Sequence, residues 1–109
     1  MVDPSPRRKL AVILVTDVVG YSSMMEKNED QTLKNLKACR NIIEGLIDEH
    51  HGSIFNTAGD SILAEFQSAV EAVICGSEFQ STIKERNNSI PEEERMESRI
   101  GINMGDVVI

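Results

Sequence analysis

Aromatic residues and cysteines are scarce in this sequence. Tryptophan is absent, and aromatic residues make up 4% of the 109 positions. The hydrophobic core must therefore be built mainly from Ile, Val, Leu and Met. The two cysteines, Cys39 and Cys75, form no Cys-x-x-Cys pair. We expect two partly buried thiols in a reducing compartment.

The sequence also lacks an excess of basic residues and any long apolar run. The net charge is -7, with 18 acidic against 11 basic residues, which argues against a nucleic-acid partner bound through a basic face. No apolar run approaches the roughly 20 residues that a membrane span needs, and no signal peptide is visible. We expect a cytoplasmic protein without a membrane segment. An acidic protein can still bind a phosphate ligand through divalent ions.

The chain length suits one domain. Residues 1–8 contain Pro4 and Pro6 and predict a flexible leader, and residues 9–109 predict the domain itself. The sequence ends on Val107-Val108-Ile109, which predicts the start of a further strand. We therefore expect an incomplete domain whose C-terminal half is absent.

The segment from Leu10 to Val15 is wholly apolar and predicts a central strand covered on both faces. Asp17 stands where this strand leaves the core, and Gly20 follows closely. A carboxylate at the end of a buried strand is costly unless a cation meets it. This arrangement predicts a metal ion at the strand end, with the next backbone N–H groups facing an anion.

Hydrophobic periodicity and capping signals predict the remaining elements. The second long helix is expected to bury Val70, Val73, Ile74, Phe79 and Ile83. Two adjacent histidines, His50 and His51, point about 100° apart on a helix and cannot easily share one ion, so they predict a frayed helix end. The expected elements are a short helical turn at 21–26, a helix capped by Asn28 and ended by Gly52, short strands around a reversal at 58–61, a helix from Ser68 to about Arg86, and a strand over 96–104.

The element order is strand, helix, strand, strand, helix, strand. It predicts an α+β fold of the ferredoxin-like βαββαβ type, an antiparallel sheet with two helices on one face. This topology brings Asp17 next to Asp60 at one edge of the sheet. Two close carboxylates repel each other unless divalent ions lie between them. Two ions about 4 Å apart would clamp both oxygens of a phosphoryl transfer.

Three motifs in this order resemble a known family. Asp17-Val-Val-Gly-Tyr-Ser22, Thr57-Ala-Gly-Asp60 and Arg99-Ile-Gly-Ile-Asn-Met-Gly-Asp106 are together similar to the class III adenylate/guanylate cyclase catalytic domain, its bacterial branch in particular. The resemblance begins at Arg8 and spans about the first half of a complete domain. It implies conversion of ATP or GTP to a 3′,5′-cyclic nucleotide and pyrophosphate by a homodimer, in cyclic-nucleotide signalling.

The resemblance also implies a role for particular residues. Asp17 and Asp60 would be the catalytic acids that bind two Mg²⁺ or Mn²⁺ ions, and the Val18 carbonyl would be a further ligand. Gly59 would form the structural turn before Asp60. The backbone N–H groups of the next segment would bind the triphosphate of the nucleoside triphosphate: Val19, Gly20, Tyr21 and Ser22.

Asn56 departs from the family pattern. It stands at the base-selecting position, where adenylate cyclases usually carry Lys, which leaves the choice of ATP or GTP open. The sequence also ends before the family's transition-state Asn and Arg, so we expect this chain alone to bind Mg²⁺–nucleotide weakly and to be inactive.

Two other interpretations stay open at this point. One is a degenerate cyclase-like domain that acts as a non-catalytic dimerisation or nucleotide-sensing module, with Asp17 and Asp60 only a strand-end acid and a turn residue. The other is a different ferredoxin-like nucleotidyl enzyme. A Gly-Gly-Asp/Glu-Glu-Phe signature and a basic surface, which would favour this second interpretation, are lacking.

Overall fold

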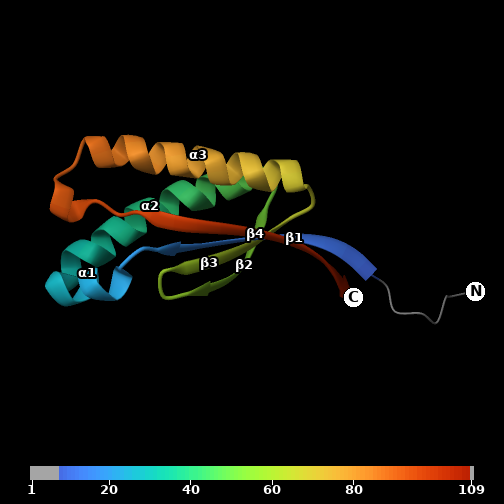
Figure 1. Cartoon of the computed structure of the whole chain (residues 1–109), viewed down its shortest axis with the longest axis horizontal. Coiled ribbons are helices and arrows are strands. Elements are labelled where there is room, and N and C mark those ends of the chain that lie inside the picture. The colour runs from blue at the N-terminus through green and yellow to red at the C-terminus, as the bar shows by residue number, and fades with distance from the viewer. Residues whose placement is uncertain (1–7, 109) are drawn as a thin grey trace, which may run out of the picture.

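The computed structural model describes residues 8–108, with side chains described for residues 10–105. Most of the predicted leader lies outside this range. The fold is α+β: helices cover one face of a four-stranded antiparallel sheet of order β2-β3-β1-β4 (Figure 1). The predicted fold class is confirmed. In chain order the elements are β1 (Arg8–Val18), α1 (Tyr21–Lys27), α2 (Glu29–Glu49), β2 (Ser53–Ala58), β3 (Ser61–Phe66), α3 (Ala69–Asn88), the 3₁₀ turn η1 (Glu92–Glu94) and β4 (Ser98–Val108).

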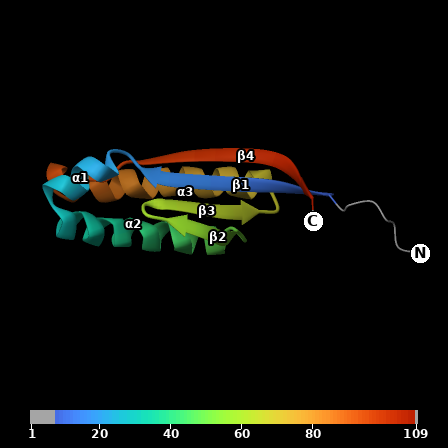
Figure 2. The ribbon, with the colours of Figure 1, turned by 90° about the horizontal axis from the view of Figure 1, so that it is seen from below.

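β1 is a central strand, paired with β3 on one side and β4 on the other. Alternate residues such as Val12 and Leu14 are fully buried against the helices. Ile13 and Val15 point to the opposite face and are only half-buried. Figure 2 shows the strands lying as one layer against α2 and α3. The expectation that both faces of β1 are covered is therefore wrong within the described residues, because both long helices pack on the same side.

The core lies between this sheet face and the two long helices. Aliphatic side chains dominate it, as the scarcity of aromatic residues predicts. Its buried members are Val12, Leu14, Val18, Leu36, Cys39, Ile43, Ile47, Ile62, Ala64, Phe66, Ala72, Cys75, Phe79, Ile83 and Met96.

α2 begins and ends with recognisable caps. The Asn28 side chain accepts a hydrogen bond from the Gln31 N–H at 3.1 Å, as predicted. At the other end, the Gly52 N–H donates to Ile47 O at 2.8 Å and the His51 N–H to Asp48 O at 3.1 Å, which is a Schellman motif.

The left-handed residue of this motif is His51, with φ 63°, so the predicted role of Gly52 as the terminating glycine is wrong. Gly52 is needed for space. A Cβ atom added there would lie 2.7 Å from carbon atoms of the Phe66 ring.

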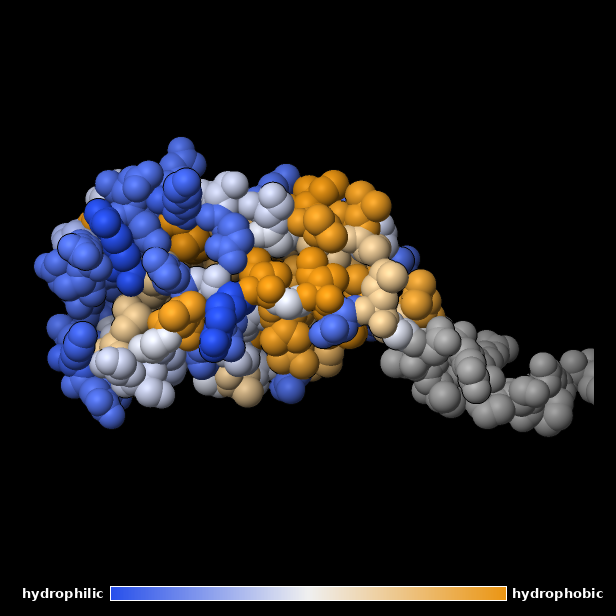
Figure 3. All heavy atoms as spheres, in the orientation of Figure 1, coloured by the Kyte–Doolittle hydropathy of each residue, from blue (hydrophilic) through white to orange (hydrophobic). Residues whose placement is uncertain are grey.

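α3 buries Phe79 and Ile83 as predicted, but the three residues predicted near its start are exposed. Ser68 caps it as expected, since its Oγ accepts from the Glu71 N–H at 3.3 Å. Val70, Val73 and Ile74, however, are 66%, 56% and 41% exposed. Figure 3 shows apolar side chains gathered over the end of the molecule where α3 begins. The buried face carries small residues at its start, including Gly76, where an added Cβ would lie 3.5 Å from Ile100. Small residues let the helix approach the sheet closely, and this turns the larger ones outward.

Candidate functional site

The structure brings Asp17 and Asp60 to the same end of the sheet. Asp17 is the penultimate residue of β1, and Asp60 lies in the turn between β2 and β3. The pairing of Thr16 with Ile62 places this turn beside the end of β1. There, Asp60 Oδ2 accepts a hydrogen bond from the Val18 N–H at 2.8 Å, across 42 residues of sequence. The Asp60 carboxylate thus contacts the peptide unit that follows Asp17.

The turn that carries Asp60 is held from two directions. Gly59 has a φ of +57°, in the left-handed region that glycine adopts readily. Arg40 of α2 donates from Nη2 to the Gly59 carbonyl at 2.8 Å. The sequence analysis missed Arg40. The available signal was a basic residue between the core positions Cys39 and Ile43, where a cation needs a partner.

Arg99 is the partner of Asp17. The two residues lie directly opposite each other on β1 and β4, with Arg99 Nε 2.9 Å from Asp17 Oδ1 and Nη2 3.1 Å from Oδ2. The hydrogen bond to Asp17 raises the pKa of Arg99, and the charges of Asp17 and Asp60 raise it further. The Arg99 side chain is 69% exposed, and exposed pairs of this kind contribute little to stability. Sequence analysis placed Arg99 in a motif but did not find this contact, which follows from the strand register.

The side chains at this end of the sheet fit a hard divalent cation. Asp17, Asp60 and the Val18 carbonyl offer only oxygen ligands, which Mg²⁺ and Mn²⁺ prefer. A cavity of about 20 Å³ lies behind them, lined among others by Asp17, Asp60 and Arg40. That volume holds on the order of one water molecule. A ligand much larger than a water molecule would therefore have to lie on the outside of the sheet.

The segment predicted to bind phosphate follows directly. Gly20 has a φ of 67° and caps α1, and the N–H groups of Tyr21 and Ser22 fall in the first helical turn, where no intrahelical acceptor exists. Val19 differs from the prediction: its N–H donates to the Glu97 carbonyl at 2.8 Å. In this conformation Val19 is therefore not available to a phosphate.

Asn56 lies on the sheet face that the long helices leave uncovered. It pairs with Leu63, which in turn pairs with Val15, so these three residues share a face with Asp17. Asn56 is exposed, and β2 is an edge strand whose described residues are all exposed. The Cα atom of Asn56 is at most about 13 Å along the chain from the Cα atom of Asp60. The Asn56 side chain can therefore contact a ligand that extends across this sheet face.

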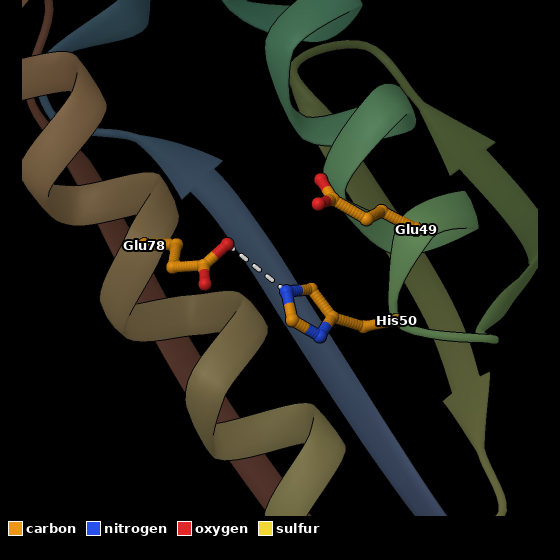
Figure 4. A group of neighbouring side chains, drawn as sticks. All are labelled: Glu49, His50 and Glu78. Carbon is orange, nitrogen blue, oxygen red and sulfur yellow. Dashed lines mark hydrogen bonds and ion pairs between the residues drawn. The ribbon is translucent and has the colours of Figure 1, made fainter.

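His50 is not part of a frayed helix end, contrary to the prediction. Its Nδ1 lies 2.8 Å from Glu71 Oε2 and its Nε2 lies 2.9 Å from Glu78 Oε2. The imidazole is 13% exposed and joins the end of α2 to α3 (Figure 4). The hydrogen bonds to Glu78 and then Glu71 raise the pKa of His50. Glu71 lies three residues after the cap Ser68, and its carboxylate contacts His50.

Comparison with known sequences agrees with the fold and the motifs. The sequence model of the family described as "Adenylate and Guanylate cyclase catalytic domain" matches residues 4–109. The chain belongs to this family. It is 40% identical over 110 residues to a Rhizobium meliloti (strain 1021) protein named "Putative adenylate cyclase 3", a match that spans all of this chain and 19% of that protein.

Solved structures show the same relationship. The adenylate/guanylate cyclase/hydrolase of Silicibacter pomeroyi superposes with a TM-score of 0.84 at 40% identity, over 96% of this chain and 62% of that one. The guanylyl cyclase Cya2 superposes with a TM-score of 0.81 at 31% identity, over 94% of this chain and 57% of that one. This chain therefore spans less than two thirds of each of these relatives.

Among the helices of residues 8–108, none combines the length and the apolar character that crossing a membrane requires.

Proposed function

We propose that this chain supplies the metal-binding half of a nucleotide cyclase that converts ATP or GTP to a 3′,5′-cyclic nucleotide and pyrophosphate. The observation that carries the proposal is the hydrogen bond from the Val18 N–H to Asp60 Oδ2 at 2.8 Å. It holds the Asp60 carboxylate at the peptide unit that follows Asp17, so that two acids distant in sequence lie at one strand end. The 40% identity to the Rhizobium meliloti protein named "Putative adenylate cyclase 3" supports the same conclusion.

Asp17, Asp60 and the Val18 carbonyl would hold two Mg²⁺ or Mn²⁺ ions. Such ions, when bound, make the ribose 3′-hydroxyl more acidic and stabilise charge on the triphosphate. Gly20, Tyr21 and Ser22 would bind phosphate oxygens through backbone N–H groups at the start of α1. Asn56 would contact the base edge, because its amide can both donate and accept a hydrogen bond.

Residues 9–109 are proposed to belong to a nucleotide cyclase catalytic domain, whose active site forms between two copies of the domain. Asp17, Arg99 and Asn56 lie on an uncovered sheet face, and the cavity behind Asp17 is about 20 Å³, far smaller than ligand pockets of about 300 Å³ or more. A partner surface facing this side would create the missing depth. The chain by itself is proposed to be inactive.

The test uses the full-length protein that contains this chain. Wild type, Asp17→Asn and Asp60→Asn are assayed for cyclic AMP and cyclic GMP with Mn²⁺ and ATP or GTP. Each substitution is expected to lower turnover at least about a hundredfold, because each removes a ligand charge from the reaction centre. Glu44→Gln, at an exposed position of α2, is the matched control. Full activity in either Asp variant contradicts the proposed roles.

The alternative is a non-catalytic module that dimerises or senses nucleotide. The observation that favours it is the bidentate contact of Arg99 with Asp17, which gives this carboxylate a cation from within the chain. A full-length protein that binds Mn²⁺–ATP but forms no cyclic nucleotide would establish this alternative.

A further inference from the structure

A second group of metal-compatible side chains lies away from Asp17 and Asp60. Glu49 and His50 stand at the end of α2, and Glu78 stands on α3. One potential ligand atom from each lies within 4.8 Å of the other two (Figure 4). The length of β2 separates this group from the turn at Asp60, so the two sets of acids do not share a ligand.

The second nitrogen of His50 carries an independent observation. Nδ1 lies 2.8 Å from Glu71 Oε2, while Nε2 lies 2.9 Å from Glu78 Oε2. A metal-ligating histidine almost always donates its other ring N–H to a carboxylate or carbonyl, which fixes its tautomer and its orientation. Glu71 supplies that partner here, on the side of the ring away from Glu49 and Glu78.

The backbone around His50 is also fixed. Its N–H donates to Leu46 O at 3.0 Å, and the Schellman bonds of the next two residues close the helix. The imidazole is 13% exposed, whereas the Glu78 side chain is 48% exposed. A rigid, shielded nitrogen ligand therefore faces exposed carboxylates that can adjust their rotamers.

We propose that Glu49, His50 and Glu78 bind a transition-metal ion of the Zn²⁺ type, with His50 Nε2 as the nitrogen ligand and Glu71 as the orienting partner. Ligands of a tetrahedral zinc ion lie about 3.3 Å apart. The separations between the potential ligand atoms here are up to 4.8 Å. They shorten to the zinc value when the exposed carboxylates of Glu49 and Glu78 change rotamer. The ion replaces the hydrogen bond between Nε2 and Glu78.

The donor set separates this site from the candidate nucleotide site. Imidazole with carboxylates suits Zn²⁺, whereas oxygen-only sets suit Mg²⁺ and Mn²⁺. Three protein ligands leave a fourth position to water or to another molecule. Because its ligands come from the end of α2 and from the middle of α3, the ion would join the two long helices.

The experiment titrates Zn²⁺ into the chain by calorimetry and follows the His50 ring nitrogens by ¹⁵N NMR. One Zn²⁺ per chain is expected, with a coordination shift at Nε2 and with Nδ1 remaining protonated. His50→Gln and Glu78→Gln are each expected to weaken binding at least about tenfold, and Glu71→Gln about tenfold through loss of orientation. Mg²⁺ at the same concentration should leave the His50 signals in place.

Two controls make the outcome decisive. His51→Gln removes the neighbouring exposed histidine and should leave Zn²⁺ affinity unchanged. Asp17→Asn should also leave it unchanged, so failure of this site is distinguishable from failure of the proposed cyclase role. The proposal is overturned if Zn²⁺ leaves the wild-type Nε2 signal unshifted, or if His51→Gln weakens binding as much as His50→Gln.

Discussion

Asp17 and Arg99 face each other across the β1–β4 pair, and the guanidinium contacts both carboxylate oxygens, at 2.9 and 3.1 Å. This contact neutralises an acid that the family resemblance assigns to metal binding. A divalent ion bound at the proposed site would therefore have to compete with Arg99 for Asp17. Because the pair is exposed, the competition is weak and a metal ion can win it.

Removing Arg99 should strengthen metal binding. We expect Arg99→Gln to raise the affinity of the Asp17–Asp60 site for Mn²⁺ about two- to fivefold, the range that an exposed ion pair supports. Electron paramagnetic resonance of free Mn²⁺ measures this directly. Arg95→Gln is the control, since exposed Arg95 donates to the Ile90 carbonyl instead. Unchanged or weaker affinity in Arg99→Gln would show that the guanidinium does not compete.

Asp60 has a structural and a proposed chemical role that substitution can separate. Asp60→Ala removes the acceptor of the Val18 N–H and should lower the free energy of unfolding by about 1–3 kcal/mol. Asp60→Asn keeps an acceptor oxygen and should cost less, while still losing Mn²⁺ affinity. Urea unfolding and Mn²⁺ titration of both variants check this. Wild-type Mn²⁺ affinity in Asp60→Asn would assign the residue to the turn alone.

Gly52 and Gly45 make a matched pair at the end and in the interior of α2. A Cβ at Gly52 would lie 2.7 Å from the Phe66 ring and 2.9 Å from Ile47, so Gly52→Ala should destabilise the fold by about 1–3 kcal/mol. Gly45 has open space around it, and Gly45→Ala should stabilise the protein by about 0.5–1 kcal/mol. Thermal unfolding distinguishes the two. Equal effects would contradict the packing account of Gly52.

The buried thiols should react slowly in the folded protein. Burial, followed by the charges of Glu78, Glu49 and Glu71, raises the pKa of Cys75 from 9.0 to about 11, and burial also raises the pKa of Cys39. At pH 8 about one Cys75 in a thousand is then a thiolate. The unfolded state loses its proton first as the pH rises, so folding stability should fall from about pH 9 to pH 11.

Iodoacetamide labelling followed by mass spectrometry tests this prediction. Labelling at pH 8 should be slow in buffer and fast in urea. Rapid modification of Cys75 in the folded protein would contradict both its burial and its raised pKa.

The sequence predicted the fold and the proximity of Asp17 to Asp60, because both depend on element order and strand polarity. Those properties are visible in hydrophobic periodicity and in the turn at Gly59. Phe79 and Ile83 of α3 were predicted correctly, but the buried positions at the start of this helix were mispredicted. Ala72 and Gly76 carry weak hydrophobic signals there, although their size decides how closely the helix packs.

Contacts made across the fold were not predictable from spacing along one element. Arg40 reaches the Gly59 carbonyl from α2, and His50 reaches two carboxylates on α3. Each of these contacts depends on the relative position of two elements, a helix and a turn for Arg40 and two helices for His50. The partner of Arg99 was accessible in principle, since strand register puts it opposite Asp17.

The most direct test of the central claim is Mn²⁺ binding to the His50→Gln chain, in which the second candidate site is disabled, with and without Asp17→Asn and Asp60→Asn. The account predicts that each Asp substitution weakens Mn²⁺ binding at least about tenfold, and that the two together weaken it by less than the product of the separate effects, because both remove ligands of one site. Mn²⁺ affinity that is unchanged in either single variant would contradict a shared cation site at the point where β1 ends and β3 begins.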